Sequence, residues 1–166
     1  MHWIPFDLHP EYPPEGIPRS QRYSSENDQH TRTTIESAGF VYAPAPVVPN
    51  STRSLELAQL AREHGCFDEV HRALFSAYWS EERDIGDPET LVEIGTSAGL
   101  DPEEIRTALE ELPHREQIRA ATAGALDLGI GGVPAWILDQ KLFVSGAQPV
   151  ELFERAMERL GHRPIE

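Results

Sequence analysis

The chain has 166 residues, and its 28 Asp and Glu against 14 Lys and Arg give a formal net charge of −14. This length is enough for about one domain with a sizeable core, and 39% hydrophobic with 25% charged residues is the composition of a soluble globular protein. The acidity excludes nucleic acid as a partner, because phosphate binding takes its free energy from clustered Lys and Arg that release counterions.

Cysteine content and the first residues set the cellular context that we expect. Cys66 is the single cysteine, so one chain contains neither an intrachain disulfide nor a thiolate-rich metal site. No apolar run approaches the roughly 20 residues that cross a bilayer. Met1 to Asp7 lacks the basic and apolar regions of a signal peptide. We therefore expect a cytoplasmic protein with no membrane partner, no metal and no cofactor.

The first fifty residues hold eight of the fourteen prolines, which leaves room only for short elements. Residues 2–8 combine a tryptophan, mixed polarity and a proline, a pattern typical of a strand near a sheet edge. Residues 11–20 follow as a loop. Residues 26–37 have a polar helical pattern, ended by Gly39, and predict a surface helix.

Five helices are then predicted in succession, from about residue 51 to 128. Asn50 or Ser51 supplies the first cap, while Asp-Pro pairs at Asp87 and Asp101 start two later helices. Apolar residues at helical spacing define the inward faces. The expected helices cover 51–64, 70–78, 88–98, 102–112 and 114–128. Together they indicate a helical subdomain.

The hydrophobic period changes after Gly129. Residues 135–138 form a short apolar run that ends at a turn at Asp139, and residues 142–144 follow. The pair predicts a β-hairpin. Gln148-Pro149 then opens a last amphipathic helix, which extends to about Leu160.

Several segments of the chain, in the right order, resemble the DsbA-like thioredoxin family, and in particular its FrnE-type branch. They are Phe6-Asp7-Leu8-His9-Pro10, Val48-Pro49-Asn50-Ser51, Leu74-Phe75-Ser76-Ala77-Tyr78-Trp79, Asp84-Ile85-Gly86-Asp87, Gly132-Val133-Pro134 and Val144-Ser145-Gly146-Ala147-Gln148-Pro149. The resemblance implies an α/β fold, with a thioredoxin-like sheet and a large inserted all-helical subdomain. Residues 1–50 and 129–166 correspond to the thioredoxin-like part, and 51–128 to the insertion.

The resemblance also exposes a departure. Members of the family begin with a strand and a helix that carries a Cys-x-x-Cys dithiol, and this sequence matches the family only from its second strand onward, so we expect an N-terminally truncated sheet. An empty central position would leave rows of backbone N–H and C=O groups unpaired, at about 1–3 kcal/mol for each buried group. We therefore expect the N-terminal strand to move inward or a second copy to supply a strand, which would make a homodimer.

The family's activity is thiol–disulfide exchange, and a chain without the dithiol is expected to be inactive as a dithiol enzyme by itself. One alternative is a redox-inactive module that binds peptides or assists assembly. Another is a relative of glutathione-dependent isomerases. The partners implied by the resemblance are a protein or peptide thiol or disulfide, or glutathione.

The resemblance assigns the substrate site to Val133 and Pro134, as a cis-proline loop, with Trp136 beside it. Cys66 lies before a helix start, where amide dipoles can activate a thiol, but a free cysteine in a turn is more often a packing residue. His64, Cys66, Asp68 and His71 are the only ligand-like cluster, and a break at Gly65 argues against one metal-binding face.

Overall fold

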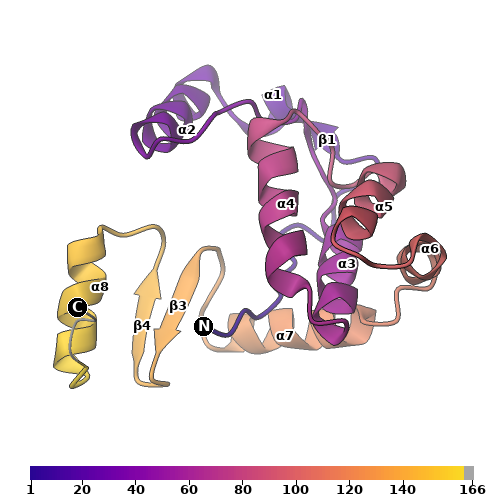
Figure 1. Ribbon diagram of the computed structural model, residues 1–166. Helices are drawn as coiled ribbons and strands as arrows, with labels where there is room; N and C mark the ends of the chain where they lie inside the picture. Colours follow the sequence, from indigo (N-terminus) through magenta and orange to yellow (C-terminus); the bar gives the residue numbers. More distant parts are fainter. Residues whose placement is uncertain (163–166) are drawn as a thin grey trace.

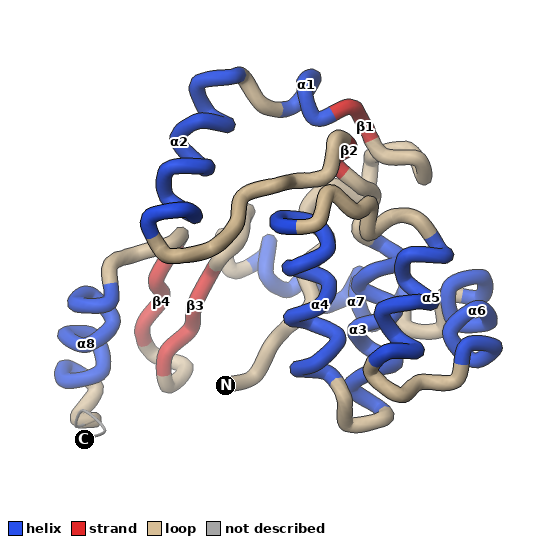
Figure 2. Tube along the Cα trace, turned by 45° about the horizontal axis from the view of Figure 1, so that its top comes forward, coloured by secondary structure: helices blue, strands red, loops and turns tan. Residues whose placement is uncertain are grey.

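A computed structural model of the chain describes residues 1–162 and shows a helical block with two projecting parts (Figure 1). The elements in chain order are β1 (Ile17–Pro18), α1 (Arg19–Arg22), α2 (Ser25–Ser37), β2 (Val47–Val48), α3 (Thr52–Glu63), α4 (Phe67–Ser80), α5 (Pro88–Ser97), α6 (Pro102–Glu111), α7 (Arg115–Asp127), β3 (Ala135–Leu138), β4 (Leu142–Ser145) and α8 (Val150–Arg159). Helices α3 to α7 form the block, while α2 and the β3–β4 hairpin with α8 project from the same side of it (Figure 2).

Helix α3 lies at the centre of the block and packs against α4, α5, α6 and α7. Leu57 of α3, Leu91 of α5 and Ile105 of α6 are fully buried. A Cβ atom at Gly95 would lie 2.6 Å from Cδ1 of Ile105, so a larger residue here would displace the Ile105 side chain between α5 and α6. The core of the described chain is therefore helical.

The helix starts predicted at Asp87 and Asp101 are confirmed with their caps, whereas the helix expected from residue 70 already begins at Phe67. The carboxylate of Asp87 accepts a hydrogen bond from the Thr90 N–H, and that of Asp101 accepts from the N–H groups of Glu103 and Glu104. At α3 the cap is the side chain of Asn50. Its Oδ1 accepts a hydrogen bond from the backbone N–H of Thr52 at 3.0 Å. Each acceptor satisfies amide groups that have no partner within the helix.

The strand predicted over residues 2–8 is wrong, because none of these residues lies in a strand. The buried Asp7 holds the segment through side chains instead of a ladder. Its N–H donates to Thr122 of α7 (3.0 Å), and its carboxylate accepts from Ser51 (3.5 Å) and Thr52 (3.2 Å) at the start of α3. A sheet ladder needs a neighbouring strand, and within residues 1–162 no strand pairs with this segment.

The predicted loop over residues 11–20 is also partly wrong. It contains β1, which pairs antiparallel with β2, and the start of α1. Gly16 has φ +72°, and a Cβ atom there would lie 2.5 Å from the carbonyl oxygen of Val48. Only glycine fits this approach, and the composition of the loop gave no sign of it. The described residues thus contain two separate two-stranded sheets and no single larger sheet.

The predicted hairpin is confirmed. Strands β3 and β4 pair antiparallel, with Ile137 opposite Phe143. Asp139 and Gln140 both have positive φ, as the tight turn requires, and the N–H of Lys141 donates to the carbonyl of Leu138 at 3.0 Å. The final helix α8 lies beside this hairpin (Figures 1 and 2). No helix in residues 1–162 is both long enough and apolar enough to span a bilayer.

A buried ionic cluster joins α3 to the start of α7. Glu56 is fully buried, and its Oε1 accepts from both the backbone N–H and Nδ1 of His114, at 2.6 and 2.7 Å. Nε2 of His114 lies 3.1 Å from the Glu63 carboxylate. Burial alone lowers the pKa of an imidazole, but hydrogen bonds to Glu63 and Glu56, together with their charges, outweigh it and raise the pKa of His114 above 6.5.

We expect His114→Gln to lower the free energy of unfolding by about 3–5 kcal/mol near pH 6, because a buried carboxylate loses its cationic partner. A raised folded-state pKa means that this contribution is fully present below pH 6.5 and is lost as the pH rises through the folded-state value. The loss should therefore be smaller near pH 9. Urea denaturation at both pH values measures it, with the exposed His30→Gln of α2 as control. An equal loss at both pH values would contradict the ionic role.

Candidate functional site

The outer edge of β3 presents unpaired backbone groups. In an antiparallel ladder, alternate residues turn their N–H and C=O groups toward the partner strand or away from it. The N–H of Gly146 donates to the Pro134 carbonyl at 2.8 Å, which makes position 134 a hydrogen-bonded position. Ala135 and Ile137 therefore point their N–H and C=O groups away from β4. Within residues 1–162 no third strand pairs with β3, so this edge is open.

Val133 and Pro134 lead directly into this edge and are both exposed, Val133 by 54%. The peptide bond between them is cis. Ile137 and Phe143, which face each other across the hairpin, are 49% and 48% exposed, because α8 covers only the opposite face. An apolar surface thus adjoins the open edge.

Trp136 lies on the other face of the hairpin, since side chains alternate along a strand. Its ring packs edge-on against Phe153 of α8, with centroids 5.3 Å apart, and lies 6.3 Å from the ring of Trp3. Its indole Nε1 is buried and has no hydrogen-bond partner within the described residues. The structure therefore separates Trp136 from Val133 and Pro134 but leaves it with an unused donor near β3.

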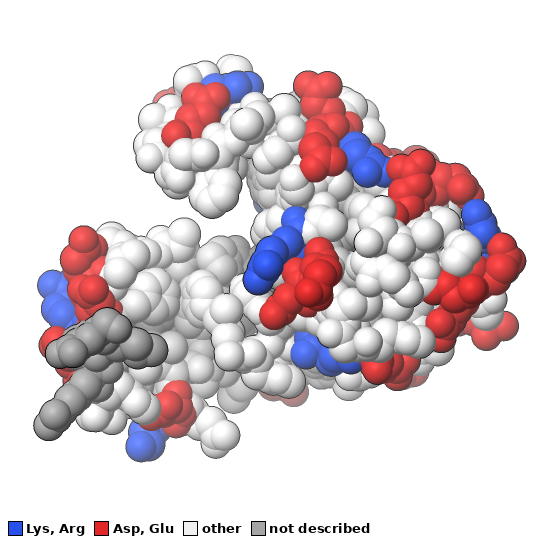
Figure 3. All heavy atoms as spheres, in the orientation of Figure 1, with Lys and Arg blue, Asp and Glu red and all other residues white. Residues whose placement is uncertain are grey.

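Aromatic rings continue from the hairpin to α4. The Trp3 ring lies 4.5 Å from that of His71, which in turn lies 5.3 Å from Phe67 and 4.9 Å from the exposed Phe75. The N-terminal segment therefore links the hairpin to the helical block. Figure 3 shows the hollow between α2 and the hairpin bordered mainly by uncharged atoms, whereas Asp and Glu gather over α5 and α6.

We expect Trp3→Ala to raise the pKa of His71. Burial is the largest influence on this imidazole and lowers its pKa below 6.5, while Asp68 acts in the opposite direction. Removing the Trp3 ring exposes the imidazole to water, so its pKa should move back toward 6.5. An NMR titration of the histidine ring protons measures the shift, with Tyr12→Ala, which removes a ring stacked on His9, as control. An unchanged His71 titration would show that Trp3 does not cover this ring.

The other candidates from the sequence lie apart from this edge. Cys66 is half-buried between α3 and α4 and packs against the helical core. His64 pairs with Glu104 at 3.0 Å, whereas His71 is stacked among aromatic rings. Within residues 1–162 no group of three or more His, Cys, Asp and Glu side chains is arranged to hold a metal ion.

Sequence reasoning missed the polar cluster that fixes α2. The guanidinium of Arg19 donates to Asp28 (3.1 Å), to the hydroxyl of Tyr78 (3.1 Å) and to that of Tyr42 (2.8 Å). Burial raises the pKa of Tyr78 to about 12, so it is a neutral phenol at neutral pH. These four residues are far apart in the sequence, and no spacing rule connects them.

A hairpin that follows a cis X-Pro bond, with a helical block ahead of it and a helix after it, is the arrangement that the resemblance to the DsbA-like family implied. The sequence model of the DSBA-like thioredoxin domain matches residues 1–158, and the chain belongs to this family. The crystal structure of a probable DsbA oxidoreductase from Streptomyces coelicolor is similar with a TM-score of 0.84 and 29% identity, over 97% of this chain and 76% of that one. The uncharacterized protein YwbO of Bacillus subtilis is 24% identical over 161 residues, which cover 95% of this chain and 80% of that protein.

Proposed function

We propose that this chain is a binding module of the DsbA-like family, from its FrnE-type branch, that takes an extended polypeptide along the open edge of β3. The observation that carries the proposal is the row of outward backbone groups at Ala135 and Ile137, directly after the exposed Val133 and Pro134. Adding a strand to such an edge gives affinity through main-chain hydrogen bonds.

Side chains around the edge support the same proposal. Ile137 and Phe143 offer exposed apolar surface to a bound segment. The glutathione-dependent reaction has no comparable supporting observation.

We also propose that the occupant of this edge includes a second copy of the chain, which gives a homodimer. No Cys-x-x-Cys helix is present among these 166 residues, and the chain spans 76% and 80% of the two relatives described above. The mainly uncharged border of the hollow supports self-association, because carboxylates that repel one another are sparse along the part of this border that Figure 3 shows.

The chain is, in this proposal, inactive as a dithiol oxidoreductase by itself. Disulfide exchange needs one thiolate that attacks and a second that resolves the mixed disulfide. Cys66 is the single thiol and lies at the junction of α3 and α4. A lone free thiol is in keeping with a reducing compartment, so we propose the cytoplasm as the location.

Reduction of insulin by dithiothreitol tests the redox part. We expect the protein to leave the uncatalysed rate unchanged, and Cys66→Ser to behave like the unaltered chain, because neither can resolve a mixed disulfide. A dithiol oxidoreductase assayed in parallel is the positive control. Acceleration that disappears in Cys66→Ser would contradict the proposal.

Ile137→Pro tests the binding edge. Proline removes an N–H that points outward and leaves the β3–β4 ladder bonds in place. We expect it to convert a dimer to a monomer in light scattering and to weaken binding of a fluorescein-labelled, alkylated insulin B chain by roughly tenfold or more.

Ser145→Pro is the matched control, because it makes the same change on the outer edge of β4. It should preserve both the dimer and the binding of the B chain. Circular dichroism checks that each variant keeps its helical content. Equal behaviour of the two variants, or a monomeric unaltered chain that binds no B chain, would refute the proposed edge.

A further inference from the structure

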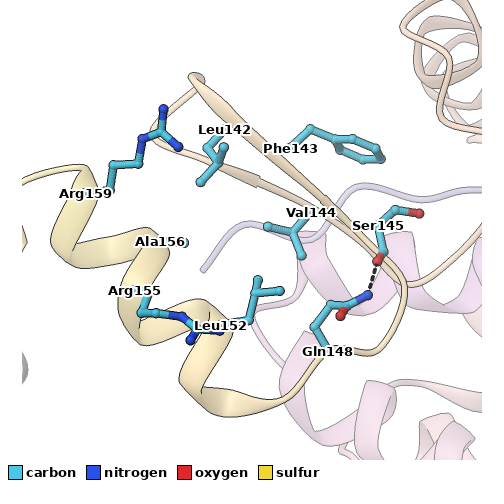
Figure 4. Close-up of a pocket in the computed structure, with 9 residues that line it drawn as sticks. All are labelled: Leu142, Phe143, Val144, Ser145, Gln148, Leu152, Arg155, Ala156 and Arg159. Carbon is cyan, nitrogen blue, oxygen red and sulfur yellow. Dashed lines mark hydrogen bonds between the residues drawn. The ribbon is translucent and has the colours of Figure 1, made fainter.

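A second groove lies between β4 and α8, on the other side of the hairpin from the β3 edge (Figure 4). Its volume is about 420 Å³. Apolar side chains of both elements, among them Leu142, Val144 and Leu152, form its floor, and α8 runs alongside β4 in both ribbon views. The groove is therefore elongated in the direction of the strand.

Among residues 1–162, two arginines are the only charged residues that line this groove, in a chain whose net charge is −14. Arg155 and Arg159 are one helical turn apart, and both side chains leave the face of α8 that is turned to β4 (Figure 4). Among residues 1–162 neither guanidinium has a carboxylate within 4.0 Å. The groove thus combines apolar surface with two cations that have no anionic partner in the described part of the chain.

The backbone of β4 gives the groove an open strand edge. Phe143 and Ser145 lie opposite Ile137 and Ala135, at positions whose N–H and C=O groups point away from the partner strand. The carbonyl of Ser145 already accepts from Nε2 of Gln148 at 2.8 Å, which leaves both N–H groups and the carbonyl of Phe143 for another partner. Within the described range no other strand pairs with β4.

The spacing of the arginines matches an extended chain. Residues four apart on an α-helix are displaced by about 6 Å along its axis. Residues two apart on a strand are displaced by about 6.7 Å and point to the same face. A strand paired with β4 can therefore place carboxylates at two alternate positions against Arg155 and Arg159.

We propose that this groove binds an extended acidic peptide segment of a partner protein as a third strand on β4. Two carboxylates at alternate positions pair with Arg155 and Arg159, and an apolar side chain two residues earlier contacts Leu152. Charge complementarity selects this partner, because the two cationic side chains face the groove and no acidic residue of the described range lines it. The site uses neither the β3 edge nor Cys66, so it is independent of the function proposed above.

Fluorescence anisotropy with the full chain tests the proposal. The probe is a fluorescein-labelled peptide of sequence Thr-Val-Thr-Glu-Thr-Glu-Thr, compared with the same peptide carrying Gln or Lys in place of Glu. We expect binding of the Glu peptide to weaken roughly threefold to tenfold in Arg155→Gln and in Arg159→Gln, and further in the double variant. Added salt should weaken it as well.

Arg119→Gln is the matched control, because this exposed arginine of α7 carries the same charge far from the groove lining. It should leave binding unchanged. Phe143→Pro should abolish binding, and Ile137→Pro should preserve it. Amide exchange adds a readout without mutation, since the bound Glu peptide should slow exchange at Phe143 and Ser145 but not at Ala135.

Three results would overturn the proposal. The first is equal binding of the Glu, Gln and Lys peptides, and the second is binding that Arg155→Gln and Arg159→Gln leave unaltered. The third is an unaltered chain that binds phosphatidylserine vesicles but not the peptide, together with loss of vesicle binding in Arg155→Gln and Arg159→Gln. That result would assign the groove to a membrane surface.

Discussion

The fold depends on where the hairpin's backbone groups find hydrogen-bond partners. An isolated two-stranded hairpin is marginally stable in water, and this one has helix α8 on one face and open edges on both strands. Buried N–H and C=O groups are almost always paired in native proteins. The helical block meets this requirement internally, whereas the hairpin meets it only in part. Both binding surfaces that we propose follow from that difference.

In this chain the single thiol and the proposed binding edge lie in different parts of the molecule. The open edge of β3 and its approach at Val133 and Pro134 are present and exposed. The single thiol lies between two helices of the block and packs against their core. The polypeptide recognition that we propose therefore involves the hairpin and not the region around Cys66. Fold alone does not define an activity.

Elements governed by local rules could be predicted from the sequence. Asp87 and Asp101 each precede a proline and cap a helix, and the short apolar run over residues 135–138 marked a strand. Elements that depend on distant partners could not. Residues 2–8 have the composition of a strand, but the hydrogen bonds of Asp7 hold them against two helices instead.

The candidate site shows the same division. The position of Val133 and Pro134 came from a motif, but the open edge came only from the ladder register. That register also sends Trp136 to the face covered by α8. That Arg155 and Arg159 line one groove could not be predicted from the sequence, because the groove forms only where β4 lies beside α8. Two arginines four residues apart on a helix are common on solvated surfaces.

The anchoring of Asp7 also determines how the chain can be extended. Its hydrogen bonds to α3 and α7 fix the direction of the first residues, and the Trp3 ring meets Trp136, so the N-terminus emerges next to β3 (Figures 1 and 2). Any polypeptide fused ahead of Met1 is held beside this strand at a millimolar effective concentration. An affinity tag on that side would compete with a ligand at the proposed edge, and a tethered ligand gains affinity without a new contact.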